Sequence, residues 1–275
     1  MKYQLFCTDV DGTLIDSTGT IPQVNLEALQ ELSEHHVCHV ITTGRMLASA
    51  RQLAAYYGIS PYMVCSNGAV VADSSGRILR GCFFTDGMME RICAIGREYR
   101  CLMGINMPDG VVYNGRNHFE DRLYHEANRL YGGSGHMIRV GYMEGYHIPE
   151  GCTEVAKISL WAKCQEDFEA IWRRVQALEG ICITTAMQWN LELTAAGISK
   201  WSGIQALLEK LHINAAQVIC LGDTMNDGEM IRRAGKGVCM GNGQPALKEI
   251  AGYIADTNEN GGVAKVIRLC LDDKL

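Results

Sequence analysis

The sequence predicts an α/β fold: a doubly wound, Rossmann-like core with a mostly parallel sheet, interrupted by an inserted α+β domain. Both ends of the 275-residue chain alternate between short apolar runs and amphipathic helical segments. That alternation is typical of a parallel sheet covered by helices on both faces. The middle carries longer and paired strand-like runs instead. We therefore expect a core made of residues 1–81 and 195–275, and an inserted α+β domain of residues 82–194.

The first part of the core follows from apolar runs and the residues that interrupt them. Leu26, Leu29 and Leu32 lie at helical spacing, with Pro22 in a first-turn position. Gly58 is placed to end the next helix. The expected strands are residues 3–7, 37–41, 62–65 and 69–72, and the expected helices are residues 22–35 and 45–57.

The second part of the core repeats the pattern. Ser199 is a good N-cap for a helix whose Ile204, Leu207, Leu208 and Leu211 form one apolar stripe. We expect strands at residues 218–221 and 237–240, helices at residues 200–211 and 226–234, and a helix that begins at Pro245.

The middle of the chain reads as α+β. Its strands are longer, and some come in pairs that a short turn could join. The expected strands are residues 101–107, 110–113, 155–161, 182–187 and 189–193, and the expected helices are residues 86–99 and 165–178.

Composition excludes several classes of protein. A hydrophobic share of 47%, a charged share of 20% and a net charge of −6 are ordinary for a soluble protein. No basic run favours nucleic acid or an anionic membrane, and no apolar run reaches the roughly 20 residues that span a bilayer. Asp9 and Asp11 interrupt the N-terminal apolar stretch, so no signal peptide is indicated. We expect a cytoplasmic protein with reduced thiols, since the closest cysteines, Cys93 and Cys101, show no Cys-x-x-Cys pattern.

Polar groups follow several expected strands. Asp9 and Asp11 come after the first strand, Thr43 and Gly44 after the second, and Asp223 after the strand at residues 218–221. In an open parallel sheet, ligands bind at the carboxyl ends of the strands. We therefore expect these groups to converge on one crevice, together with Lys200 at the start of a helix.

The mixture of acids and donors indicates a metal ion and an anion. Asp9, Asp11, Asp223 and Asp227 would repel one another unless a hard cation joined them, and ligation by oxygen alone suits Mg²⁺. The remaining groups are hydrogen-bond donors, which suggest a ligand with several oxygens, and phosphate fits best. These expected phosphate-binding groups are the backbone N–H groups of Val10 and Gly44, the Thr43 hydroxyl, the Asn226 amide and the Lys200 ammonium.

These motifs, in this order, resemble those of the haloacid dehalogenase superfamily. They are Asp-x-Asp-Gly-Thr-Leu from Asp9, Thr-Gly-Arg from Thr43, Lys200, and Gly-Asp-x-x-Asn-Asp from Gly222. The large insertion between the second and third motifs resembles the Cof-type hydrolase and phosphatase branch. So do Ser66-Asn67-Gly68-Ala69 and the tail from Met240. The resemblance covers both ends of the chain well, and the insertion, the family's cap, only in size and style.

The resemblance implies a role for each matching residue. Asp9 would be the nucleophile that forms an aspartyl-phosphate, and Asp11 would protonate the leaving oxygen and then take a proton from the attacking water. Mg²⁺ would be held by Asp9, by the backbone carbonyl of Asp11, and by Asp223. Asp227 would support that site from outside. The phosphate would be bound by Val10, Thr43, Gly44, Lys200 and Asn226.

Some features depart from the family pattern or stay open. Trp201 stands where the family usually has Gly, which could crowd the start of its helix. Thr42 precedes Thr43, so the motif hydroxyl could belong to either, although adjacency to Gly44 favours Thr43. Four residues late in the insertion could either pack in the domain or face the substrate: Met187, Trp189, Asn190 and Glu192.

Other motifs favour plain interpretations. Gly241 and Gly243 begin a dinucleotide-like pattern, but too little chain follows for a nucleotide-binding half. The eight histidines show no metal-ligand spacing.

We therefore expect a Mg²⁺-dependent phosphatase that acts on a small phosphorylated metabolite, such as a sugar phosphate, through an aspartyl-phosphate. A phosphomutase of the same superfamily and a non-catalytic phosphate-binding regulator are the alternatives. The sequence indicates no oligomeric state.

Overall fold

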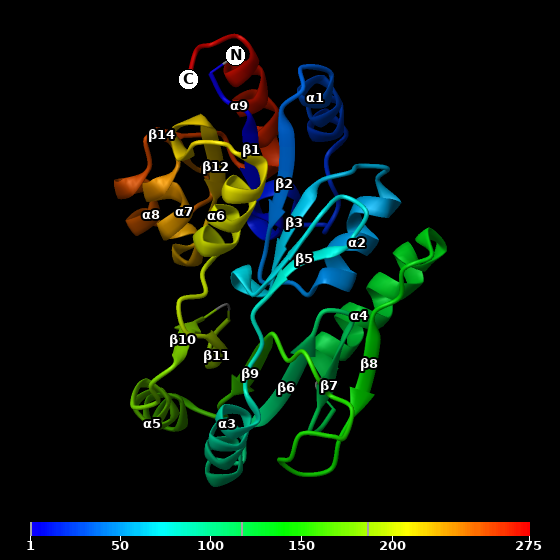
Figure 1. The fold of residues 1–275 in the computed structure, drawn as a ribbon, viewed down its shortest axis with the longest axis vertical. Helices are drawn as coiled ribbons and strands as arrows, with labels where there is room; N and C mark the ends of the chain where they lie inside the picture. Colours follow the sequence, from blue (N-terminus) through cyan, green and yellow to red (C-terminus); the bar gives the residue numbers. More distant parts are fainter. Residues whose placement is uncertain (1, 117, 186) are drawn as a thin grey trace.

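Two β-sheets organise the chain in the computed structural model, which describes residues 2–116, 118–185 and 187–275. The eight-stranded sheet lies in the upper part of Figure 1 and the six-stranded sheet in the lower part. Both chain termini lie together at the top of that view, far from the six-stranded sheet. The six-stranded sheet is built from residues 102–195, so it interrupts the larger unit in sequence.

The eight-stranded sheet has the order β14-β13-β12-β1-β2-β3-β4-β5. Its first six strands are parallel, and β4 and β5 continue it antiparallel. Strand β1 lies between β2 and β12, so the chain builds outward from β1 in both directions. The strands are β1 (Leu5–Thr8), β2 (Cys38–Thr42), β3 (Tyr62–Cys65), β4 (Val70–Ala72), β5 (Ile78–Gly81), β12 (Val218–Gly222), β13 (Lys236–Cys239) and β14 (Tyr253–Ile254).

Helices cover both faces of this sheet (Figure 1). The alternation of side chains along β1 sends Phe6 into one apolar cluster and Leu5 and Cys7 into the other. The first cluster packs under α1 (Gln23–Glu34), α2 (Leu47–Tyr56) and α9 (Gly262–Leu271). The second packs under α6 (Lys200–Leu211), α7 (Gly228–Arg233) and α8 (Pro245–Ile250).

The six-stranded sheet has the order β10-β11-β9-β6-β7-β8. One of its faces packs in a separate apolar cluster with helices α3 (Asp86–Glu98) and α5 (Gln165–Gln176). Helix α4 (His118–Tyr131) lies beside β7 and β8. The strands are β6 (Leu102–Met107), β7 (Gly110–Tyr113), β8 (Arg139–Tyr142), β9 (Lys157–Trp161), β10 (Ile181–Thr184) and β11 (Asn190–Ala195).

The two units contact each other through α2. Met46, just before α2, is 1% exposed and packs with Val111 and Tyr113 of β7. The Ala48 amide donates to the Pro108 carbonyl at 2.8 Å. Apolar contact and a backbone hydrogen bond therefore fix the six-stranded sheet against the larger unit.

The predicted fold class is confirmed: a doubly wound, mostly parallel sheet with an inserted α+β segment. The domain boundaries after residues 81 and 194 remain a prediction. Two element predictions were wrong in detail. The run at 182–187 gives a strand only to Thr184, and Ala186 lies outside the described residues. The helix at 226–234 is divided into a 3₁₀ turn (Met225–Asp227) and α7. The sequence prediction missed helices α4 and α9 and strands β5, β8 and β14.

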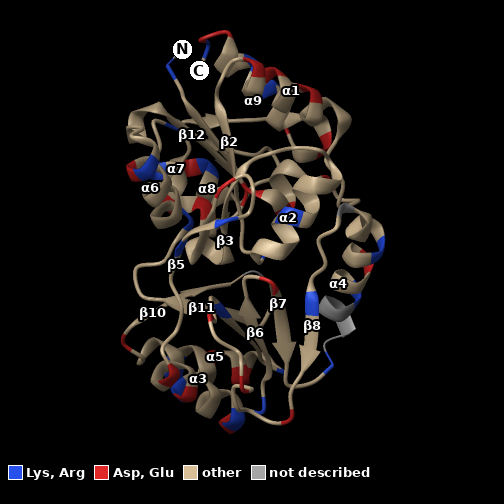
Figure 2. Ribbon diagram, turned by 45° about the vertical axis from the view of Figure 1, so that its right-hand side comes forward, with Lys and Arg blue, Asp and Glu red and all other residues tan. Residues whose placement is uncertain are grey.

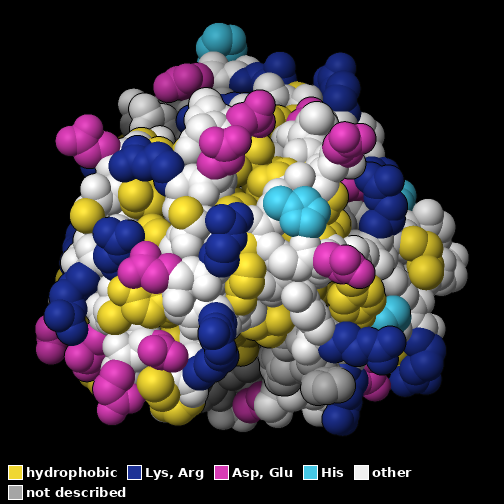
Figure 3. Space-filling model, turned by 90° about the horizontal axis from the view of Figure 1, so that it is seen from below, with side chains coloured by type: hydrophobic (Ala, Val, Ile, Leu, Met, Phe, Trp, Pro, Cys, Tyr) yellow, Lys and Arg dark blue, Asp and Glu magenta, His cyan; other side chains and the backbone are white. Residues whose placement is uncertain are grey.

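The surface carries mixed charge. Basic and acidic positions alternate over the outer helices in Figure 2. The face seen from below in Figure 3 also intersperses Lys and Arg with Asp and Glu. In the described part of the chain, no helix is both long and apolar enough to cross a membrane.

Candidate active site

The predicted site residues gather where β1, β2 and β12 end. Asp9 follows β1 directly, and its N–H donates to the Leu221 carbonyl of β12 at 3.0 Å. Thr43 follows β2, and Asp223 follows β12. Because the chain leaves β1 toward both sides of the sheet, this is the switch point at which an open α/β sheet binds its ligand.

A tight turn after β1 brings the two halves of the chain together. Gly12 lies in this turn with φ of 75°, a conformation that favours glycine. A Cβ atom on Gly12 would lie 2.3 Å from a carboxylate oxygen of Asp223. Asn242 donates to the Gly12 carbonyl at 2.8 Å and holds the turn against the C-terminal segment. Glycine is therefore required here for the turn to approach Asp223.

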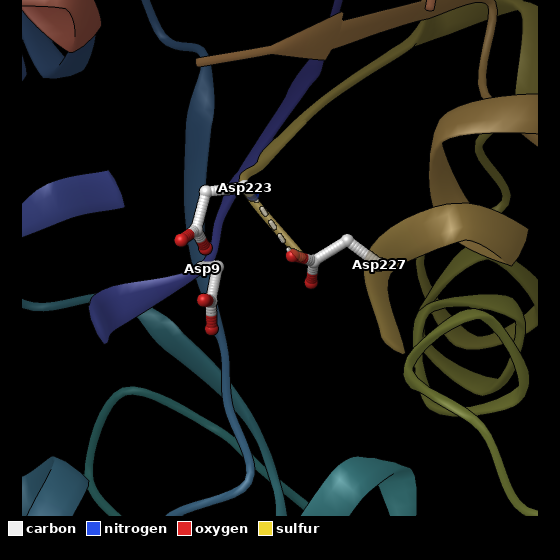
Figure 4. Close-up of side chains that lie close together, drawn as sticks. All are labelled: Asp9, Asp223 and Asp227. Atoms are coloured by element: carbon white, nitrogen blue, oxygen red, sulfur yellow. Dashed lines mark hydrogen bonds between the residues drawn. The ribbon is translucent and has the colours of Figure 1, made fainter. Parts of the chain in front are cut away.

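Three carboxylates form the centre of the site. Oxygen atoms of Asp9, Asp223 and Asp227 lie within 4.8 Å of one another, and Figure 4 shows the three side chains close together. One oxygen of Asp227 accepts the N–H groups of Asp223 at 3.0 Å and Thr224 at 3.2 Å. Asp227 thereby fixes the segment that carries Asp223.

Lys200 lies between two of these acids. Its ammonium donates to Asp9 at 2.7 Å and to Asp227 at 2.6 Å, and its side chain is 2% exposed. Lys200 is the first residue of α6, and Ser199 caps that helix by accepting the N–H of Ser202 at 3.1 Å. The predicted N-cap is confirmed, and it places the lysine at a fixed point of the site.

Burial and mutual repulsion shift the acids of the cluster. Burial raises the pKa of Asp9 well above its ordinary value, and the charges of Asp227 and Asp11 add to that rise while Lys200 opposes it. Burial, with the charge of Asp227, raises the pKa of Asp223 to about 6. Burial alone would lower the pKa of Lys200, but the charges of Asp227 and Asp9 raise it. Lys200 therefore stays charged, but its single positive charge does not neutralise all the carboxylates of the cluster.

The oxygens that are free of hydrogen bonds fit a hard cation. Asp223 Oδ1 is buried and has no hydrogen-bond partner among the described residues. Both oxygens of Asp227, in contrast, are engaged by Lys200 and by backbone N–H groups. A cation held by carboxylate oxygens would therefore meet Asp9 and Asp223, with Asp227 orienting them from outside.

Asp11 is held by Arg45, an interaction that the sequence did not indicate. The Arg45 guanidinium donates to both oxygens of the Asp11 carboxylate, with Nε to Oδ2 at 2.8 Å. The charge of Arg45 and its hydrogen bonds lower the pKa of Asp11 below the ordinary value. In this arrangement Asp11 is an ionised, oriented carboxylate.

The two threonines after β2 point to different places. The Thr42 hydroxyl donates to the sulfur of Met230 at 3.5 Å, inside the sheet–helix core. Thr43 is 1% exposed, and its hydroxyl oxygen accepts the N–H of Arg45 at 3.1 Å. Thr43 is therefore the hydroxyl that stays with Gly44 at the end of the strand.

The structure also locates the remaining predicted residues. The Val10 side chain is fully buried in the core, so only its backbone can face a ligand. The side-chain oxygen Oδ1 of Asn226 accepts a hydrogen bond from the Thr224 hydroxyl at 2.7 Å, which holds the Asn226 side chain in the turn beside Asp227. Trp201 is 5% exposed and packs in the core under α6. It therefore points away from the capped start of the helix and does not crowd it.

Side chains of the six-stranded sheet reach the same place. Lys157 of β9 donates to the Gly44 carbonyl at 2.9 Å. It also forms an ion pair with Glu192 of β11, which in turn accepts the Asn67 amide at 2.8 Å. The sequence left Glu192 open between packing and substrate contact, and Lys157 was not singled out. No local signal marks either residue, because Lys157 and Glu192 lie 35 positions apart and their other partners, Gly44 and Asn67, lie more than a hundred positions away in sequence.

Comparison with known families shows that this chain is a hydrolase. It belongs to the haloacid dehalogenase-like hydrolases, whose family profile matches residues 6–267. The predicted family is thereby confirmed.

Named relatives can be aligned with nearly the whole length of this chain. The 5-amino-6-(5-phospho-D-ribitylamino)uracil phosphatase YcsE of Bacillus subtilis is 30% identical over 273 residues, covering 96% of this chain and 94% of its own. The HMP-PP phosphatase of Yersinia pseudotuberculosis is 27% identical over 250 residues, covering 90% of this chain and 87% of its own. A haloacid dehalogenase-like hydrolase from B. subtilis has the same fold, with a TM-score of 0.86 at 23% identity, covering 96% of this chain and 99% of its own.

Proposed function

We infer that this chain is a Mg²⁺-dependent phosphatase that hydrolyses a small phosphorylated metabolite through an aspartyl-phosphate on Asp9. The observation that carries the inference is the Asp9 carboxylate, buried at the end of the central strand and held by the Lys200 ammonium at 2.7 Å. A carboxylate that is fixed and partly neutralised can approach a phosphate without being repelled. The relatives named above are phosphatases of small phosphorylated molecules, which supports the same substrate class.

The residues divide the work between two half-reactions. Asp9 attacks phosphorus in line with the leaving oxygen, and Thr43, Gly44 and Lys200 hold the phosphoryl oxygens. A bound Mg²⁺, held by Asp9, the Asp11 carbonyl and Asp223, would neutralise charge on those oxygens. Water then attacks the aspartyl-phosphate, and phosphate leaves.

Asp11 moves the protons in both half-reactions. Its ionised carboxylate suits the second one, in which it takes a proton from the attacking water. In the first half-reaction Asp11 must carry a proton to the leaving oxygen, so its contact with Arg45 must loosen when the substrate is bound. Arg45 is therefore a positioning residue that holds Asp11 ready between turnovers.

Phosphate release from 4-nitrophenyl phosphate tests the proposal. We expect release to require Mg²⁺, and Asp9→Asn to abolish it, by about 10³-fold or more, with an unchanged circular dichroism spectrum. Rapid quenching should show a phosphoryl group on the intact protein by mass, and Asp9→Asn should lack it. Asp256→Asn, which changes an exposed acid paired with Lys265, should keep full activity.

Three outcomes would redirect the proposal. Near-full activity of Asp9→Asn would contradict the covalent mechanism. Transfer of the phosphoryl group to a second hydroxyl, without phosphate release, would identify a phosphomutase. An absence of release at every metal concentration, with phosphate still bound, would favour a regulator.

A further inference from the structure

Three side chains form a bridge between the two units, next to Gly44 at the end of β2. Lys157 contacts Glu192 and the Gly44 carbonyl, and Asn67 donates to Glu192 at 2.8 Å and to the Thr184 hydroxyl at 3.1 Å. We call Lys157, Glu192 and Asn67 the bridge. The reaction described above gives none of them a role.

The bridge is buried and charged, and taking charged groups out of water costs free energy. The Lys157 and Glu192 side chains are 8% and 10% exposed, and Asn67 is 2% exposed. A buried ion pair contributes little net stability, because desolvation of both charges offsets their attraction. Apolar contacts around Met46 already hold the units together. The bridge therefore calls for an explanation other than stability.

Near the bridge, the sheet face turned toward the larger unit is polar, whereas on β7 the same face carries the apolar contacts of Val111 and Tyr113. Alternate residues of β9 and β11 turn Ile158 and Leu193 into the apolar cluster with α3 and α5, and the opposite residues toward the larger unit. The latter face bears buried, uncharged hydrogen-bonding side chains. They are Asn106 at 4%, Ser159 at 2% and Asn190 at 1% exposed.

Two amide oxygens beside this face have unused capacity. Asn67 Oδ1 and Asn190 Oδ1 are buried and have no hydrogen-bond partner within the described part of the chain. Asn67 Oδ1 would lie 2.9 Å from a Cβ atom on Gly44, so it adjoins the phosphate-binding segment. Buried polar atoms are normally paired, so unpaired acceptors indicate a place for a donor from a ligand.

The cationic side chains near the reacting position, in contrast, are already paired with carboxylates in this structure. Three of them act on the Asp11 carboxylate through their charge: Arg45, Lys200 and Lys157. Arg45 is paired with Asp11 itself, Lys200 with Asp9 and Asp227, and Lys157 with Glu192. Of these three, Lys157 is the one to which the proposed reaction gives no role, and Glu192 already neutralises it.

We propose that the bridge determines specificity: because Glu192 neutralises Lys157, the site selects an uncharged leaving group that carries hydroxyl or amide groups. A leaving group with a carboxylate or a second phosphate is disfavoured, since burying an unpaired charge beside Glu192 is costly. This inference rests on the proposed phosphatase function and adds the substrate class. Asn67 orients Glu192 from the larger unit, so selection depends on the two sheets being in contact.

Two substrates of equal shape test the proposal. 4-Carbamoylphenyl phosphate and 4-carboxyphenyl phosphate differ only in an amide against a carboxylate. We expect the wild-type protein to favour the amide in kcat/KM by about tenfold or more, the ratio that corresponds to 1.4 kcal/mol. Glu192→Gln frees the Lys157 charge and should move the ratio toward the carboxylate by a similar factor. Lys157→Met leaves Glu192 unpaired and should move the ratio the opposite way.

Opposite shifts distinguish specificity from a structural role. A variant that merely loosens the packing of the two units lowers both rates together and leaves the ratio unchanged. Glu98→Gln is the matched control, since it removes a pair with Arg174 that is exposed and joins α3 to α5. Its ratio should equal that of the wild type.

The outcomes separate this inference from the proposed function. A wild-type ratio near one, or a ratio that neither bridge variant moves, would overturn the specificity role while hydrolysis itself persisted. Failure to hydrolyse either aryl phosphate would overturn the proposed function, and the inference with it.

Discussion

The strongest stability prediction concerns Lys200→Met. The substitution removes the positive charge of the Lys200 side chain, which is 2% exposed. The substitution keeps an unbranched chain of similar length, so packing changes little. It leaves Asp9 and Asp227, both buried, without the ammonium that they share. The predicted consequence is a large loss of folding stability from electrostatics alone.

The distances set the size of the loss. At 2.7 Å and an effective dielectric constant of about 20, Coulomb attraction is roughly 6 kcal/mol for each carboxylate. Desolvation of the three groups takes back several kcal/mol for each ion. Removing one partner of a buried pair typically costs about 3–5 kcal/mol. We expect Lys200→Met to lie in that range, against a total stability of about 5–15 kcal/mol.

Urea unfolding followed by circular dichroism measures the change. Asp227→Asn, combined with Lys200→Met, completes a double-mutant cycle, because the second substitution removes one of the two stranded charges. The double variant should be more stable than the sum of the single losses predicts, by about 1–3 kcal/mol. Lys210→Met, an exposed lysine in the last turn of the same helix, is the control and should change stability by less than about 1 kcal/mol.

Two results would refute the reasoning. A loss below about 1 kcal/mol for Lys200→Met would mean that the ammonium does not neutralise buried acids. Additive losses in the cycle would mean that Lys200 and Asp227 do not interact, whatever their distance.

Three further predictions concern the core, and urea unfolding measures each. Burial lowers the pKa of His39 from 6.5 to about 3. Between these pH values the imidazole is protonated in the unfolded chain and neutral in the folded chain. The free energy of unfolding therefore falls as the pH drops, by up to about 1.4 kcal/mol per pH unit. His39→Gln should flatten that slope, and an unchanged slope would assign it to other groups. Met46→Ala should cost about 2–5 kcal/mol, because Met46 is 1% exposed between the two units; Met137→Ala, at a residue 58% exposed, should change little, and equal losses would contradict the packing argument. Gly68→Ala should cost on the order of 3 kcal/mol, since φ is +105° and the new Cβ would lie 2.0 Å from a backbone carbonyl oxygen; Gly87→Ala, in open space within α3, should stabilise the protein by up to about 1 kcal/mol. Tolerance of the first glycine substitution would show that the loop relaxes.

Part of the inserted segment could not be assigned from the sequence. Helix α4 is strongly amphipathic but short of apolar residues, so its pattern resembles that of an exposed loop. Its neighbour on the larger unit is α2, whose Gln52 side chain donates a hydrogen bond to the Asn128 side-chain oxygen at 3.0 Å. This contact between α2 and α4 joins residues that are 76 positions apart in sequence. The residues near α4 in sequence therefore contain too little information to predict the helix.

The sequence by itself determined the fold class and predicted which polar residues follow the strands of the core. Strand and helix periods are local, and so are the residues that follow each strand, so local patterns suffice to place Asp9, Thr43 and Asp223 at strand ends. Parallel strands then bring their carboxyl ends to one edge, which is why these residues meet.

Tertiary structure alone decided which partner each charged side chain has. Arg45 pairs with Asp11 across 34 positions, and Lys157 and Glu192 reach Gly44 and Asn67 across more than a hundred. No periodicity encodes such pairs, because they depend on how two sheets are packed against each other. The physical reason is that charge pairing is set by distance in space, whereas the sequence directly specifies only the neighbours along the chain.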